Sequence, residues 1–243
     1  MSSSAPQLLR HQKATIPHVI QTRRNKKKVV PGNGESEKGS TRRLQKSRIK
    51  LKLTVMVAKR NIPEAWKNQW HKPMISLFDY IPARYEATER EKQIRSLIWD
   101  FKAGKRSKQV AAIVAGKIAE KFGSFADTIV FVCVPASSAE RTEKRYRDFC
   151  EEVSNLCGCM NGYKAVKVGG KRMTIHETKK GKSIQNTETI TLNTDFFNGK
   201  RVLVFDDILT KGHSYAQFAC ALEQLGAEVL GGYFLGRTIL SYN

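Results

Sequence analysis

The spacing of apolar side chains predicts two consecutive helices in the first half of the chain. One runs from about Thr88 to Lys102, has apolar residues three and four positions apart, and begins with a capping box of Thr88 and Glu91. Gly104 ends this helix, and a second apolar stripe predicts a helix from about Ser107 to Phe122. Each helix therefore has one face to bury against a core.

Unbroken apolar runs predict strands that are buried on both faces. Residues 128–134 and 202–205 are such runs, and both are too short for a capped helix. A helix that ends near Gly226 and a last strand within 227–239 follow. Residues 49–57 alternate apolar with basic side chains, as in a half-exposed edge strand. Doubly buried strands between helices are typical of an α/β fold with a mainly parallel central sheet flanked by helices.

Weaker patterns assign the remaining segments. A helix is predicted from about Lys144 to Leu156, and a short strand from about Lys164 to Val168. Residues 58–76 show neither the helical nor the strand period of apolar residues. Trp66 and Trp70 are nevertheless spaced for one helical face, and we expect them to pack against the domain rather than bind bases.

Positive charge is concentrated at the N-terminus. The chain has 243 residues and a net charge of +21, and residues 1–50 carry 13 Lys and Arg against two acids. We therefore predict a disordered basic tail (1–50), a lead-in segment (51–80) and one domain (81–243). The tail is either a solubilising extension or an arm that attracts nucleic acid by counterion release.

Cysteine usage and hydropathy indicate the compartment. Five cysteines form no CxxC pair, and an odd number fits a reducing cytosol. We interpret the pair Cys157 and Cys159 as incidental, with metal or redox use as the alternative. No apolar stretch is long enough for a membrane span and the N-terminus has no secretion-signal pattern, so a soluble, cytoplasmic protein without a membrane partner is expected.

The candidate chemistry follows the run 202–205. Asp206 and Asp207 come first, then a turn with hydroxyl side chains and Gly212, then the predicted helix. Amide groups at a helix N-terminus and the helix dipole favour a phosphate, and small residues let it approach. The chain has no GxxxxGK[ST] and no GxGxxG after this strand. Two carboxylates before such a cradle suit a ribose 5-phosphate, whose hydroxyls lie beside its phosphate.

This stretch, VLVFDDILTKGHS, resembles the signature of the type I phosphoribosyltransferases, which bind phosphoribosyl pyrophosphate (PRPP). The resemblance implies that Asp206 and Asp207 are the catalytic acids that hold the ribose hydroxyls, and that the following loop wraps the 5-phosphate. Lys211 departs from the family's small residue, and it either adds a cation or crowds the site. The implied PRPP-binding residues are Asp206, Asp207, Thr210, Lys211, Gly212, His213 and Ser214.

The resemblance also implies two contributors to pyrophosphate binding. The loop after Val134 would grip pyrophosphate through Pro135, Ala136, Ser137 and Arg141, ahead of a basic run that includes Lys144, Arg145 and Arg147. The alternative is a solvated helix N-terminus. The long polar segment 169–193 would be a flexible hood over PRPP, with Lys179, Lys180 and Lys182 as candidates to reach pyrophosphate, or else a mobile loop without a catalytic role.

Within this family the chain looks most similar to the ComF-type, competence-associated proteins. The segments 85–102 and 104–122, the stretch KRYRDFCEEVS and the residues from Ser183 carry that likeness, which covers about 80–240. The CxxC zinc ribbon that often opens these proteins is missing, since no cysteine precedes Cys133.

The resemblance implies transfer of a 5-phosphoribosyl group from PRPP to a nitrogen nucleophile, with release of pyrophosphate. Mg²⁺ would bind through PRPP, with no direct protein ligand assigned. The acceptor is not identified, and a homodimer is possible. The alternative is a non-catalytic protein on the same fold that binds PRPP, a nucleotide or nucleic acid, linked to DNA uptake or regulation.

Overall fold

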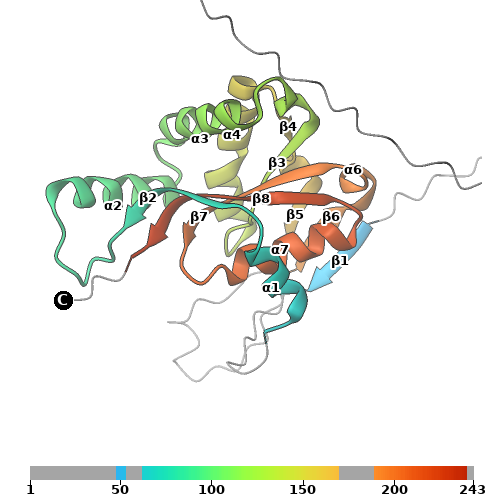
Figure 1. Ribbon diagram of the computed structural model, residues 1–243, viewed down its shortest axis with the longest axis horizontal. Coiled ribbons are helices and arrows are strands. Elements are labelled where there is room, and N and C mark those ends of the chain that lie inside the picture. The colour runs from blue at the N-terminus through green and yellow to red at the C-terminus, as the bar shows by residue number, and fades with distance from the viewer. Residues whose placement is uncertain (1–47, 53–61, 170–188, 240–243) are drawn as a thin grey trace, which may run out of the picture. The chain divides into compact units, whose positions relative to one another are not determined.

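The computed structural model describes residues 48–52, 62–169 and 189–239, and it contains two β-sheets (Figure 1). The larger sheet has five strands in the order β2-β8-β7-β3-β4, and every neighbouring pair is parallel. This confirms the predicted α/β class with a mainly parallel central sheet. The strands are β2 (Met74–Tyr80), β3 (Ile129–Cys133), β4 (Met160–Asn161), β7 (Arg201–Leu209) and β8 (Glu228–Thr238).

The smaller sheet is antiparallel and has the order β1-β6-β5. Its strands are β1 (Arg48–Lys52), β6 (Thr189–Asn193) and β5 (Val166–Gly169). Strand β1 overlaps the predicted edge strand, and it includes residues 48–50 of the predicted tail. The rest of that tail and the hood candidates Lys179, Lys180 and Lys182 lie outside the described residues.

The helices flank the larger sheet. They are α1 (Glu64–Trp70), α2 (Glu89–Lys102), α3 (Ser107–Phe122), α4 (Ala139–Cys157), α6 (Thr194–Phe197) and α7 (His213–Gln224), with 3₁₀ turns η1 (Gly123–Thr128) and η2 (Tyr163–Ala165). The predicted bounds of α2 and α3 are confirmed, as is the Thr88–Glu91 capping box. The predicted start of α4 at Lys144 is wrong, because Ser138 caps the helix by accepting the Arg141 N–H (3.2 Å) and so begins it at Ala139.

Alternate residues of the central strands point to opposite faces of the sheet. Leu203 and Phe205 pack with α2, α3 and α4, whereas Val202 and Val204 pack with α7. Figure 1 shows α3 and α4 on one side of the sheet and α1 and α7 on the other. The continuous apolar run at 202–205 is therefore explained by burial on both faces.

An aromatic cluster fixes α2 and α4 against β7. Phe149 of α4 lies with its ring centroid 4.8 Å from Phe205 and 4.9 Å from Phe101 of α2, and all three side chains are fully buried. Offset and edge-to-face aromatic pairs stabilise such a contact beyond the area they bury. Because Phe205 directly precedes Asp206, this cluster holds the strand at the point where its acids begin.

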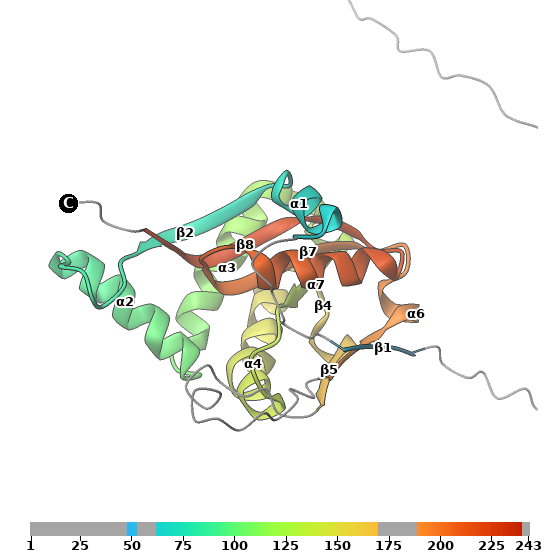
Figure 2. The ribbon, with the colours of Figure 1, turned by 90° about the horizontal axis from the view of Figure 1, so that it is seen from below.

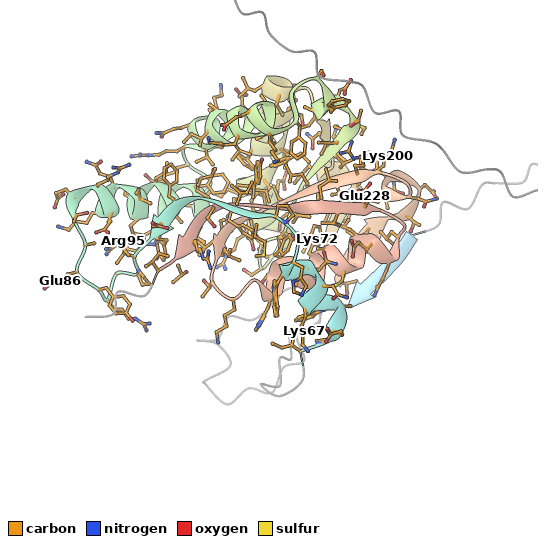
Figure 3. The ribbon with its side chains drawn as sticks, viewed as in Figure 1. Lys67, Lys72, Glu86, Arg95, Lys200 and Glu228 are labelled. Carbon is orange, nitrogen blue, oxygen red and sulfur yellow. The ribbon has the colours of Figure 1, made fainter. Side chains whose placement is uncertain are left out.

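Helix α1 covers the opposite face and packs on α7. As expected from their spacing, Trp66 and Trp70 pack against the apolar cluster on that face. Lys72, labelled in Figure 3, follows α1, donates to the Val229 carbonyl oxygen (2.8 Å) and forms an ion pair with Glu223 of α7. Strand β2, which lies within the predicted lead-in segment, then becomes an edge strand beside β8 (Figure 2).

Candidate functional site

The two acids lie inside strand β7 rather than after it. The prediction ended the strand at Phe205, where its pairing with β3 also ends, opposite Cys133. Pairing with β8 continues to Leu209, opposite Arg237, so β7 extends beyond its other neighbour. Because side chains alternate along a strand, Asp206 and Asp207 point to opposite faces of the sheet. The structure therefore gives the two neighbouring carboxylates different surroundings.

Asp207 is buried, with 7% of its surface exposed, and is balanced by two cations. Its carboxylate forms an ion pair with Arg145 of α4, and Lys102 Nζ lies 3.4 Å from its second oxygen. Arg145 also donates from Nε (3.1 Å) and Nη2 (2.9 Å) to the carbonyl oxygen of Lys102, the last residue of α2. Arg145 therefore connects the acid, α4 and the end of α2.

Asp206 lies on the other face and is only partly buried. One of its carboxylate oxygens accepts the backbone N–H of Asp207 (2.8 Å), and no ion pair among the described residues involves it. Burial, together with the neighbouring Asp207 carboxylate, raises the pKa of Asp206 well above its ordinary value. Within the described residues, Asp206 thus has no cation in direct contact, unlike Asp207.

The loop between β7 and α7 surrounds a hollow of about 290 Å³, which we call the loop hollow. Helix α7 begins at His213, so its first turn and its dipole face this space. The lining contains all five loop residues predicted to wrap a phosphate, and Asp206, but not Asp207. The loop hollow is lined by Asp206, Ile208, Leu209, Thr210, Lys211, Gly212, His213, Ser214, Tyr215 and Phe234.

Two side chains of this loop have individual surroundings. The Thr210 hydroxyl lies 2.9 Å from the hydroxyl of Thr238 at the end of β8, which ties the loop to that strand. Lys211 lines the loop hollow with an exposed side chain. An exposed lysine can move toward an anion or away from it, so both alternatives for Lys211 stay open.

Helix α1 supports the loop from outside. Gly212 has a φ of 68°, and an added Cβ would lie 2.9 Å from Trp70 Nε1. That indole N–H donates to the Gly212 carbonyl oxygen (3.4 Å). The His213 ring lies against both tryptophans, with centroids 5.8 Å from Trp70 and 6.2 Å from Trp66. The sequence predicts that these tryptophans pack against the domain but does not predict their contact with the loop, because helical spacing does not say which element a face meets.

The second candidate loop is closed by its own hydrogen bonds. The Ala136 N–H donates to Thr142 Oγ1 (3.0 Å), and Arg141 Nη1 donates to the Ser137 hydroxyl (2.9 Å). Pro135 and Ala136 follow β3 at the sheet edge where β7 carries its acids, because the two strands are parallel neighbours. Thr142, which sequence reasoning missed, occupies the Ala136 amide that an anion would otherwise contact.

A second hollow, of about 550 Å³, lies between the end of α2 and the first half of α4, and we call it the cationic hollow. Four of its side chains are cations and one is an acid. Two of those cations, Lys102 and Arg145, are the partners of Asp207, so this hollow adjoins that carboxylate. The lining residues are Trp99, Lys102, Ala103, Glu140, Arg141, Lys144 and Arg145.

The cationic hollow separates the members of the predicted basic run. Lys144 and Arg145 come three and four residues after Arg141, so both lie on the side of α4 that lines this hollow with Arg141. Arg147 is not part of that lining and instead forms exposed ion pairs with Glu143 (2.8 Å) and Asp148 (3.0 Å). Lys102 comes from another helix, so its place here could not be inferred from the basic run.

Neither a metal centre nor a membrane helix is found in the described part of the chain. No three or more His, Cys, Asp or Glu side chains there are grouped so that they could hold a metal ion. Among the helices described there, none is long and apolar enough to cross a membrane.

Sequence comparison finds that the chain is similar to a phosphoribosyltransferase. One similar protein is the orotate phosphoribosyltransferase of Wolinella succinogenes, which is 29% identical over 123 residues. The match covers 51% of this chain and 48% of the relative, so the chain spans about half the length of the curated relative it matches. No family model matches the chain.

Solved structures that resemble the chain include two adenine phosphoribosyltransferases. The enzyme of Rhodothermus marinus is 18% identical and aligns over 51% of this chain and 64% of its own, with a TM-score of 0.32. The enzyme of Giardia lamblia, complexed with 9-deazaadenine, is 14% identical over 55% of this chain and 80% of its own, with a TM-score of 0.35. The sequence match supports a likeness to phosphoribosyltransferases in general, and closeness to the ComF-type proteins stays a prediction.

Proposed function

We propose that this protein is a phosphoribosyltransferase that transfers the 5-phosphoribosyl group of PRPP to a nitrogen nucleophile and releases pyrophosphate. The observation that carries this proposal is the loop hollow, in which Asp206 and the residues Thr210 to Ser214 line one space at the N-terminus of α7. Helix amides and a left-handed glycine suit a phosphate, and an adjacent carboxylate suits the hydroxyls of the attached ribose.

The acids take different parts in this proposal. Asp206, which has no ion-pair partner among the described residues, accepts hydrogen bonds from a ribose hydroxyl. Asp207 holds Lys102 and Arg145 beside the cationic hollow and keeps lone pairs free for a second hydroxyl. The carboxylates thus orient the ribose between a phosphate at one hollow and cations at the other.

The departing pyrophosphate needs positive charge where its own charge develops. The C1–O bond to pyrophosphate breaks with its electron pair on oxygen, while the acceptor nitrogen forms the new bond to C1 and loses its proton to water. Lys102, Arg141 and Lys144 of the cationic hollow stabilise that leaving group, and the two hollows fix the direction of attack.

Mg²⁺ fits the residues present. Magnesium keeps several waters and binds through one or two carboxylates together with substrate phosphates. Asp206, whose oxygens form no ion pair with any residue that the structure describes, supplies such a carboxylate, and PRPP supplies the phosphate oxygens. When bound, the ion neutralises charge on pyrophosphate. The names of the similar proteins refer to orotate and adenine, which are a pyrimidine and a purine. A ring nitrogen of a nucleobase is therefore the first acceptor to test with this protein.

The experiment is calorimetric titration with PRPP, with and without Mg²⁺, followed by measurement of pyrophosphate release with candidate bases. The double variant Asp206→Asn/Asp207→Asn is expected to lose PRPP binding. Glu120→Gln is the matched control, because Glu120 is an exposed acid of α3 that pairs with Lys117 (2.6 Å) and lines neither hollow. Unchanged affinity in the double variant, with a native circular dichroism spectrum, overturns the assignment.

The alternative is a non-catalytic role in binding nucleic acid. Trp99 is 49% exposed and lies in the cationic hollow among four cations, an arrangement that also suits a stacked base beside phosphates. Binding of that kind weakens steeply as salt rises from about 50 to 200 mM, whereas PRPP binding depends mainly on Mg²⁺. Titration of a labelled oligonucleotide over this range, with and without residues 1–47, distinguishes the two functions.

A further inference from the structure

Two cysteines meet where helix α4 ends. Cys157 is the last residue of α4, and Cys159 directly precedes β4. Gly158 between them has a φ of 78°, with its N–H bonded to the Ser154 carbonyl oxygen (2.8 Å). This left-handed residue turns the chain back so that the two Sγ atoms lie 3.3 Å apart. The two thiols are therefore in van der Waals contact, and a disulfide between them requires only a small local movement.

The members of this pair differ in exposure and acidity. Cys157 is partly exposed, whereas Cys159 is only 4% exposed. The hydrogen bond with the Cys159 thiol, with help from backbone N–H groups, lowers the pKa of Cys157 to about 7, and the same contact and burial raise the pKa of Cys159. A thiol whose pKa lies near the ambient pH is an effective attacking group in disulfide exchange. Cys157 is thus suited to be the attacking thiol, and Cys159 is suited to be the second thiol, which attacks Cys157 afterwards.

We propose that Cys157 and Cys159 are a redox-active dithiol that forms a reversible disulfide by exchange with a small-molecule disulfide such as oxidised glutathione. The Cys157 thiolate attacks one sulfur of the oxidant, whose S–S bond breaks and releases one glutathione thiolate. Cys159 then loses its proton to water or buffer and attacks Cys157 Sγ, which releases the second glutathione. Two protein thiols are oxidised and one oxidised glutathione becomes two reduced molecules.

The chain contains a built-in comparison. Cys133 and Cys150 also have Sγ atoms 3.3 Å apart, but their exposed fractions are 6% and 0%. Burial raises the pKa of Cys133. This second pair has the same Sγ–Sγ distance but is almost inaccessible to solvent, so it tests whether proximity alone makes a cysteine pair reactive. We expect Cys133 and Cys150 to remain unmodified under mild oxidant.

The dithiol lies at the opposite end of α4 from the cationic hollow, and it lines neither hollow. The last α4 residue that lines the cationic hollow, Arg145, is 12 residues before Cys157, which corresponds to about 18 Å along the helix. Oxidation is therefore expected to leave PRPP binding unchanged. The dithiol and the proposed transferase function can accordingly succeed or fail independently.

The test treats the full-length protein with oxidised glutathione, quenches it with an alkylating agent, and analyses it by mass spectrometry after cleavage at Arg147, Glu152 and Lys164. Cleavage at Glu152 separates Cys150 from the pair. The expected result is a peptide lacking two hydrogens across Cys157 and Cys159, restored by dithiothreitol, with Cys133 and Cys150 unmodified.

Three variants make the order of steps measurable. Cys159→Ser is expected to stop at a single glutathione adduct on Cys157, Cys157→Ser to give neither adduct nor disulfide, and Cys150→Ser to behave as wild type. Should a serine variant misfold, the wild-type peptide map alone decides the matter. Absence of the 157–159 disulfide in folded wild type, or equal modification of Cys133, overturns the proposal.

Discussion

The neighbouring acids Asp206 and Asp207 should respond oppositely to the same substitution. Asp207→Asn removes the charge that balances Arg145, in an ion pair whose side chains are 10% and 12% exposed. Breaking a buried pair by removing one partner costs roughly 3 kcal/mol, because the other charge stays buried and unpaired. For a domain of this size that loss lowers Tm by roughly 6 to 12 °C.

Asp206→Asn should stabilise the protein at neutral pH. Burial and the Asp207 carboxylate raise the pKa of Asp206 in the folded state, so the folded protein holds this proton more tightly than the unfolded chain. Stability therefore falls as pH rises from the ordinary range of an aspartic acid, about 4, through the raised pKa. The amide cannot ionise, and its oxygen can still accept the Asp207 N–H.

Urea unfolding followed by circular dichroism, at several values between pH 4 and 8, measures both effects. The advantage of Asp206→Asn over wild type should shrink as pH falls, because wild-type Asp206 then holds its proton in the folded state and increasingly takes up a proton in the unfolded chain as well. Equal destabilisation by the two substitutions, or an advantage of Asp206→Asn that does not depend on pH, would refute the reasoning. Asp206→Asn should nevertheless weaken PRPP binding, so the charge that costs stability is the one that function needs.

Four further substitutions test the surroundings of the acids. Gly212→Ala should cost about 1 to 2 kcal/mol in urea unfolding and weaken PRPP binding, because the left-handed φ is unfavourable for alanine and the new Cβ meets Trp70. Phe149→Ala should cost about 3 to 5 kcal/mol by the same assay, and a loss below 1 kcal/mol would contradict the packing described. Arg141→Gln should weaken pyrophosphate binding in calorimetry, whereas Arg147→Gln should not, and equal effects would exclude the cationic hollow as the pyrophosphate site.

Local signals explain which elements could be predicted from the sequence. Helix α2 was predicted at its observed bounds because its capping box and apolar stripe lie within the helix itself. The start of α4 was misplaced because the stretch from Ser138 to Glu143 is polar and reads as a loop, although Ser138 is a cap. Strand β2 was missed because it is an edge strand whose residues are nearly all partly buried, without a clear alternation.

The site was predictable as far as its residues are consecutive. The loop from Thr210 to Ser214 was predicted as a unit and lines one hollow. The placement of Asp206 and Asp207 on opposite faces of the sheet could not be predicted. The length of β7 is set by its pairing with β8, and β8 begins more than twenty residues after these acids. The contacts of Lys102 and Trp70 with the site also depend on long-range packing that no local pattern contains.

The positions of the tryptophans give this protein two intrinsic optical probes. Trp66 and Trp70 are partly buried against His213 at the start of α7, while Trp99 is 49% exposed in the cationic hollow. Indole emission shifts to longer wavelength with exposure to water, so the two environments emit in different parts of the spectrum. A ligand that fills only the loop hollow should change the short-wavelength part of the tryptophan emission. A ligand that fills the cationic hollow should quench the long-wavelength part, which comes from Trp99. Unlabelled protein can therefore report which end of a bound molecule arrives first.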